Sequence, residues 1–211
     1  MARESMIIDP ADQSLKENHK IMIGSIVPRP IAFVSTKSND GILNLAPFSY
    51  FNGVCSNPPT IMFAPARRGY DGLTKDTLNN IQETKEFVVN LVSEEISEPM
   101  VACATDYDRE IDEFEVSGLT PIDSIKVKPP RVKESKVSFE CNLNTVIEIG
   151  KAEPGAGFVV LGTIVMFHID DKVYKNGHID LEALNPIGRL AGNSYTRIFD
   201  NFDITRQIKP K

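Results

Sequence analysis

The sequence predicts a mainly β protein with a barrel core and a few short helices. Five runs are rich in the β-branched and aromatic residues typical of strands, and they cover residues 31–36, 60–64, 86–92, 136–148 and 157–169. Turn sequences at residues 38–41 and 56–59 separate neighbouring elements. Connections this short suit an antiparallel barrel. Helical signals are few, so we expect most of the core to be β-structure.

The strands differ in their sequence signals. The run 31–36 follows Pro28 and Pro30, which stiffen the chain where it enters a strand. The run 86–92 is almost continuously apolar, which is typical of a strand buried on both faces. We therefore expect the second of these strands to be central.

Two short helices are expected. Apolar residues three positions apart predict a helix over residues 77–84. Either Ser93 or Ser97 is expected to cap another helix over residues 99–104.

The chain is expected to fold as a single domain over residues 1–211. The proline pair at residues 129–130 marks a loop inside the fold rather than a linker, and no fixed-period repeat is present. Residues 185–211 are polar and aromatic, which predicts a C-terminal extension at a partner surface.

Composition excludes several classes of partner. The formal net charge is −6 and the lysines and arginines are spread along the chain, so no basic stripe is available for nucleic acid. The start of the chain lacks the apolar core of a signal peptide, and no run approaches the roughly 20 apolar residues of a membrane span. We therefore expect a cytoplasmic protein with neither a nucleic-acid nor a membrane partner.

No metal centre or familiar catalytic motif is visible. Cys55, Cys103 and Cys141 form no Cys-x-x-Cys pair, so each is expected to be a reduced, buried apolar residue. The three histidines are scattered without metal-ligand spacing. Since no nucleophile elbow, Walker loop or paired-carboxylate motif is present either, no catalytic side chain is assigned and any chemistry belongs to a cofactor.

Residues 67–80 combine groups that a phosphate needs. Two arginines, two glycines, a lysine and hydroxyl groups precede the helix expected from residue 77. Backbone N–H groups at a helix N-terminus favour an anion, while Lys75 adds positive charge and Thr77 a hydroxyl donor. The local alternative is a capped helix start, with Thr74 or Asp76 as the cap and Lys75 as a solvated surface charge.

Two other segments suit contact with a flat ring. Residues 44–56 interleave small, hydroxyl and aromatic side chains, and Ala46, Ser49 and Phe51 are expected to offer apolar walls and polar edges from one strand-loop, with Ser49 and Phe51 on one side. The alternative for the aromatic residues is core filling. Near the C-terminus, residues 189–195 form a turn whose arginine can stabilise an anionic ring, or simply a loop with a surface arginine.

Four motifs in the same order resemble the flavin reductase-like family, particularly its flavoredoxin branch. They are residues 28–32, residues 44–51, residues 75–77 with Asn80, and residues 189–192 with Tyr195. Residues 113–120 join them with the pattern Glu-Phe-Glu followed by Gly-Leu-Thr. The agreement extends over nearly the whole chain, so the resemblance overrides the local alternatives.

The resemblance implies a fold, a cofactor and a set of binding residues. The implied fold is an FMN-binding split β-barrel with Greek-key topology. It is assembled as a homodimer with the cofactor near the subunit interface. Residues 185–211 would then lie at the site or at the dimer interface. The implied FMN-binding residues are Pro30, Ile31 and Ala32 along the flavin; Asn44, Ala46, Pro47, Ser49 and Phe51 at the ring and ribityl chain; Lys75, Asp76, Thr77 and Asn80 at the phosphate; and Arg189 and Tyr195 closing the site. Within the phosphate set, Lys75 and Thr77 are expected to bind while Asp76 chiefly caps the helix. The usual turn of the family is Arg-Leu-Gly-Gly, and Ala191 stands here in place of its first glycine. A glycine at this place can adopt a backbone angle that alanine disfavours.

Three functions are then open. The first is a flavin reductase in which NADH or NADPH passes hydride to N5 of FMN. The second is a flavoredoxin-like electron-transfer protein, which keeps its FMN, exchanges electrons with a redox protein partner and oxidises no nicotinamide. The third is a phosphate-ligand binding module on the same scaffold.

Overall fold

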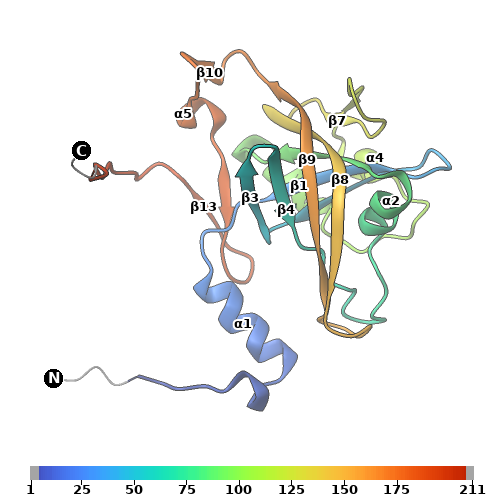
Figure 1. Cartoon of the computed structure of the whole chain (residues 1–211), viewed down its shortest axis with the longest axis vertical. Helices are drawn as coiled ribbons and strands as arrows, with labels where there is room; N and C mark the ends of the chain where they lie inside the picture. The colour runs from blue at the N-terminus through green and yellow to red at the C-terminus, as the bar shows by residue number, and fades with distance from the viewer. Residues whose placement is uncertain (1–4, 208–211) are drawn as a thin grey trace.

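The computed structural model describes residues 5–207, and its centre is a seven-stranded antiparallel sheet that curls around an apolar core (Figure 1). The strands are β1 (Ala32–Lys37), β2 (Leu43–Phe48), β3 (Phe51–Ser56), β4 (Pro59–Phe63), β5 (Glu86–Leu91), β8 (Val137–Ile149) and β9 (Gly157–Ile169). Their order in the sheet is β2-β1-β5-β8-β9-β4-β3. After two hairpins, the long connection between β4 and β5 returns the chain to lie beside β1, the kind of return that characterises a Greek key.

Smaller elements surround this sheet. Three two-stranded pairs are formed by β6 (Pro121–Ile122) with β7 (Arg131–Val132), β10 (Tyr174–Lys175) with β11 (His178–Ile179), and β12 (Ile187–Arg189) with β13 (Tyr195–Arg197). The helices are α1 (Leu15–Ser25), α2 (Asp76–Thr84), α3 (Ser97–Ala102), α4 (Glu113–Ser117) and α5 (Leu181–Leu184), with 3-10 turns at Pro10–Asp12 and Glu94–Ile96. The prediction of a mainly β fold with a few short helices is confirmed.

All five predicted strands are present, and the turn at residues 38–41 joins β1 to β2. Strand β5 pairs with both β1 and β8, and its residues Phe87 to Asn90 are buried, so it is the central strand expected. The sequence runs did not identify β2 and β3. Both lie at the edges of the sheet, where Pro47 is tolerated because no second neighbour needs its missing N–H.

Strand β1 separates two apolar clusters. Ala32 and Val34 point into the barrel, while Phe33 packs outside it against Met100 of α3 and Phe114 of α4. This alternation follows from the period of two residues along a strand. Helices α3 and α4 are thereby held against the sheet beside the end of β2.

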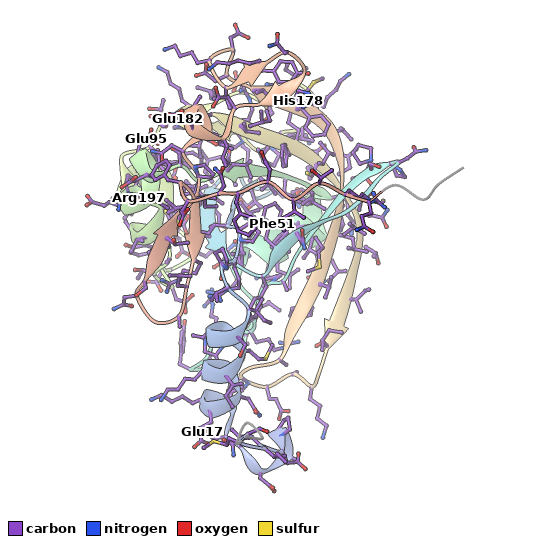
Figure 2. The ribbon with its side chains drawn as sticks, turned by 90° about the vertical axis from the view of Figure 1, so that its left-hand side faces the viewer. Glu17, Phe51, Glu95, His178, Glu182 and Arg197 are labelled. Carbon is purple, nitrogen blue, oxygen red and sulfur yellow. The ribbon has the colours of Figure 1, made fainter. Side chains whose placement is uncertain are left out.

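Helix α1 stands apart from the sheet. Ser14 and Glu17 form a capping box at its start, which explains why the helix begins there. None of its residues is buried. Figures 1 and 2 show α1 projecting from the sheet, with Glu17 near its far end.

The expected helix caps are wrong in detail. Lys75 is the N-cap residue of α2 and makes no side-chain cap hydrogen bond. The Thr74 hydroxyl donates to Asn79 instead, and the Asp76 carboxylate pairs with Arg68. Neither Ser93 nor Ser97 caps α3, which follows directly from a 3-10 turn and needs no separate start.

One cysteine also differs from expectation. Cys103 and Cys141 are buried, but Cys55 is exposed on the edge strand β3.

Within residues 5–207, no helix has the length and apolar character needed to cross a bilayer.

Candidate functional site

Two neighbouring hollows lie where β2 ends and α2 begins. The larger is a cleft of ≈ 250 Å³, and the smaller is a cavity of ≈ 40 Å³. Both are lined by Pro47, Phe48 and Lys75, so Lys75 stands at their junction. The predicted ring-binding and phosphate-binding segments therefore meet at one place.

The N-terminus of α2 opens toward this junction. The first backbone N–H groups of a helix have no partner within the helix, and here no side chain caps them. Lys75 and Thr77 line the cavity beside them. This arrangement provides hydrogen-bond donors and positive charge for an anion.

The lining of the cleft is basic. His19, Arg29, Lys75 and Arg189 line it, and none of its lining residues is acidic. In the cavity, by contrast, each cation faces a carboxylate: Lys75 Nζ lies 2.5 Å from Asp106 Oδ1, and Arg68 Nη2 lies 2.7 Å from Asp76 Oδ2. Among the described residues, Arg29 and Arg189 of the cleft therefore have no carboxylate partner, whereas the charge of Lys75 is shared with Asp106.

A chain of partly buried hydrogen bonds forms the floor of the cavity. The Thr77 hydroxyl donates to Asn44 Oδ1 at 2.7 Å, and Asn44 Nδ2 donates to Glu113 Oε1 at 2.8 Å. Behind them, Asn80 Nδ2 donates to Thr36 Oγ1 at 3.0 Å. The predicted residues Asn44, Thr77 and Asn80 are thus brought together, with Asn80 behind the floor rather than on it.

Glu113 was not predicted as a site residue. The residue is 6% exposed, and its carboxylate also accepts a hydrogen bond from the backbone N–H of Leu45 at 3.0 Å. Burial raises the pKa of Glu113 to about 7, although these hydrogen bonds oppose the shift. The carboxylate therefore changes its charge near neutral pH.

Arg29 is the second residue that the sequence analysis missed. Its guanidinium is buried and donates to Ser49 Oγ at 3.3 Å and to the carbonyl oxygens of Ile23, Ile26 and Leu190 at 2.9, 2.7 and 3.0 Å. Burial lowers the pKa of Arg29, and nearby Arg189 adds to this effect. The side chain ties α1, the β2–β3 turn and the C-terminal turn together around the cleft.

Arg189 is held in place at the end of the cleft. Its guanidinium carbon lies 4.5 Å from the ring centroid of Tyr195, and Nη1 donates to the Ser194 carbonyl at 3.2 Å. The alanine at position 191 is accommodated because the left-handed backbone conformation of this turn falls on Gly192, at φ +59°. The turn therefore retains an arginine facing the cleft.

Several predicted residues do not line the two hollows. Ala32 is fully buried in the barrel core. Phe51 of β3, which Figure 2 labels, packs against the same core. Pro30 and Ile31 line a separate apolar hollow. Tyr195 lines neither of them, and its ring packs against the guanidinium of Arg189. Those that do line the cleft or cavity are Asn44, Ala46, Pro47, Ser49, Lys75, Asp76, Thr77 and Arg189.

The chain matches a protein-family model described as the flavin reductase like domain, over residues 23–182. An uncharacterized protein of Aquifex aeolicus is 44% identical over 182 residues, which are 86% of this chain and 90% of that protein. The protein YwrF of Bacillus subtilis is 38% identical and matches over 95% of this chain and 99% of its own length.

Solved structures agree with the fold. Nitrilotriacetate monooxygenase component B from Bacillus cereus has a TM-score of 0.91 and 38% identity, covering 96% of this chain and 100% of that one. The 2-nitrobenzoate 2-nitroreductase NbaA of Pseudomonas fluorescens has a TM-score of 0.85 and 30% identity, covering 96% of each chain. A split-barrel protein from Shewanella frigidimarina, 22% identical with a TM-score of 0.81 and covering 96% of this chain and 100% of that one, shows the same architecture. The split-barrel prediction is confirmed.

Proposed function

Since the chain belongs to the flavin reductase-like family, we propose that it binds FMN and uses it to oxidise NADH or NADPH. The observation that carries this proposal is the junction at Lys75, where a basic cleft meets the uncapped N-terminus of α2. A ligand with an anionic end and a flat ring fits both parts.

The residues present fit FMN by the chemistry of their donors. The amides at the start of α2 and the ammonium of Lys75 would hold the phosphate. Pro47, Tyr50 and Ala64 give the cleft apolar walls, against which the ring would lie.

The protein groups would act by orientation and charge. When bound, FMN supplies a ring that accepts hydride at N5 and then releases electrons to an acceptor. Arg189 would stabilise negative charge on the ring, because Tyr195 and the Ser194 carbonyl fix its guanidinium at the cleft. Arg29 would keep Ser49 and the Leu190 carbonyl in place around it.

The second candidate is an electron carrier that receives electrons from a redox protein. Flavoredoxins of Desulfovibrio vulgaris and Methanosarcina acetivorans share the fold at 22% and 18% identity, which speaks only for the architecture. The structures at 38% and 30% identity carry the names of a monooxygenase component and a nitroreductase. We therefore favour the enzyme.

A homodimer is part of the proposal. The edge strand β3 exposes Asn52 through Ser56, and Phe199, Phe202 and Ile204 after β13 are also exposed. Exposed edges and apolar side chains of this kind are suited to a subunit interface. Sedimentation velocity of the full chain would reveal the expected dimer, and a monomer at micromolar concentration would exclude it.

Nicotinamide oxidation separates the two candidates. The FMN-loaded protein is mixed with NADH or NADPH, with and without added free flavin, and the loss of nicotinamide absorbance is followed. A reductase oxidises at least one nicotinamide, whereas a carrier leaves both unchanged and is reduced only by a protein donor.

A further inference from the structure

Glu113 opens helix α4 and belongs to the Glu-Phe-Glu motif, to which the proposed function gives no role. Its two carboxylate oxygens lie on the buried side of the cavity and accept hydrogen bonds from Asn44 Nδ2 and from the Leu45 amide. It therefore touches β2 at the point where β2 meets the cavity.

An ionised carboxylate fixes the direction of the neighbouring hydrogen bonds. It can only accept, so Asn44 must turn its NH₂ group toward Glu113. The amide oxygen of Asn44 then faces Thr77, whose single hydroxyl proton is given to it at 2.7 Å. The lone pairs that Thr77 Oγ1 retains can only accept a hydrogen bond from a ligand.

We propose that Glu113 is a positioning residue that orients Asn44 and Thr77 so that the cavity floor accepts a hydroxyl group from the polyol chain of the flavin. This inference rests on the proposed function and names the part of the ligand that the cavity takes. It also revises the expected role of Thr77, because a hydroxyl committed to Asn44 has no proton to donate to a phosphate. The phosphate is then left to Lys75 and the amides of α2.

Protonation of Glu113 reverses this direction. A carboxylic acid can donate to Asn44 Oδ1, so the amide turns over and its NH₂ group faces Thr77, whose own proton then points to the ligand. Burial raises the pKa of Glu113 to about 7, with the N-cap residue Asp112 adding to the shift, so both states occur near neutral pH.

Other charged and titratable groups surround Glu113. They are Asp112 before α4, Cys103 directly after α3, the pairs Lys75–Asp106 and Arg68–Asp76 at the cavity, and Tyr107. Burial raises the pKa of Cys103 to about 11, so its thiol stays neutral in this range.

The test compares two flavins that carry no phosphate. Riboflavin has the polyol chain and lumiflavin lacks it, so a pH effect on the chain appears in riboflavin binding alone. Affinities are measured by quenching of flavin fluorescence at about pH 6 and about pH 8.5, on either side of the Glu113 transition. The polyol hydroxyl keeps a hydrogen bond to Thr77 in either direction, but only the chain that ends on the ionised carboxylate is charge-assisted. Riboflavin is therefore expected to bind about two- to fivefold more weakly at the lower pH, while lumiflavin changes little.

Two variants identify the group responsible. In Glu113→Gln the amide cannot titrate, so riboflavin should bind equally at both pH values and near the affinity of the wild type at low pH. Glu115→Gln changes an exposed carboxylate of the same helix and should keep the pH dependence of the wild type.

The outcomes separate this inference from the proposed function. If both flavins bind and their affinities change equally with pH, the role of Glu113 is overturned while the proposed function stands. An unchanged pH dependence of riboflavin binding in Glu113→Gln would have the same meaning. No binding of any flavin would overturn both. Because the comparison of the two ligands uses the wild-type protein, it decides the matter even if Glu113→Gln folds poorly.

Discussion

Lys75 Nζ and Asp106 Oδ1 lie 2.5 Å apart at the mouth of the cavity, where α2 faces the loop after α3. Lys75 is also the cation proposed to hold the phosphate. The carboxylate of Asp106 therefore occupies a position next to the charge that an anionic ligand needs. Binding of the ligand and the Lys75–Asp106 pair compete.

Removal of this competitor should strengthen FMN binding. Asp106→Asn keeps the shape of the side chain and removes its charge, and a partly exposed ion pair predicts a gain of about two- to fivefold in FMN affinity. The measurement is a fluorescence titration at low salt, with Asp108→Asn in the same loop as the control. Weaker binding by Asp106→Asn than by the control would show that Asp106 assists the ligand.

Lys75→Ala should discriminate between flavins with and without a phosphate. A charge-assisted hydrogen bond predicts that FMN affinity falls by about ten- to a hundredfold, while riboflavin affinity changes little. Titration of both flavins measures the ratio, and Lys133→Ala at an exposed position away from the cleft is the control. An equal loss for both flavins would place the phosphate elsewhere.

Arg29→Met should loosen the walls of the cleft. It leaves the carbonyl oxygens of Ile23, Ile26 and Leu190 without their donor, which predicts a loss of about 1–3 kcal/mol in the free energy of unfolding. Because none of the residues of α1 is buried, hydrogen exchange in this helix should accelerate most. Urea unfolding and hydrogen exchange measure the two effects. Unchanged exchange in α1 would show that other contacts hold the helix.

Glu113 should make stability fall as pH rises. Its folded-state pKa of about 7 lies above the usual value of 4.5, so the folded state holds the proton more tightly and loses stability between those pH values. Relative to Glu113→Gln, the wild type should lose on the order of 3 kcal/mol of unfolding free energy across this window, with no further change above it. Urea unfolding of both proteins at several pH values gives the difference. A constant difference would mean that Glu113 titrates alike in the folded and unfolded states.

Most of the fold could be predicted because its signals are local. The β-branched runs of β1, β4, β5, β8 and β9 are visible in the sequence, as is the turn before β2. Strands β2 and β3 could not be recognised because edge strands tolerate proline and polar residues that interrupt the pattern. The exposure of Cys55 has the same origin, since β3 has a neighbour on only one side.

The site could be predicted where a motif carries the binding residue itself. Asn44, Lys75, Thr77 and Arg189 lie in such motifs and line the cleft or cavity. Arg29 was missed, although it lies between two noted prolines, because its partners are up to 161 residues away in the chain. Glu113 was quoted only as part of a pattern, since its bond to Asn44 spans 69 residues and exists only in the folded chain.

The absorption spectrum of the full chain after incubation with FMN and removal of free flavin tests the central claim most directly. We expect a yellow protein whose bound flavin absorbs blue light and whose spectrum bleaches when NADH or NADPH is added without oxygen. A colourless protein that retains no FMN would contradict the account.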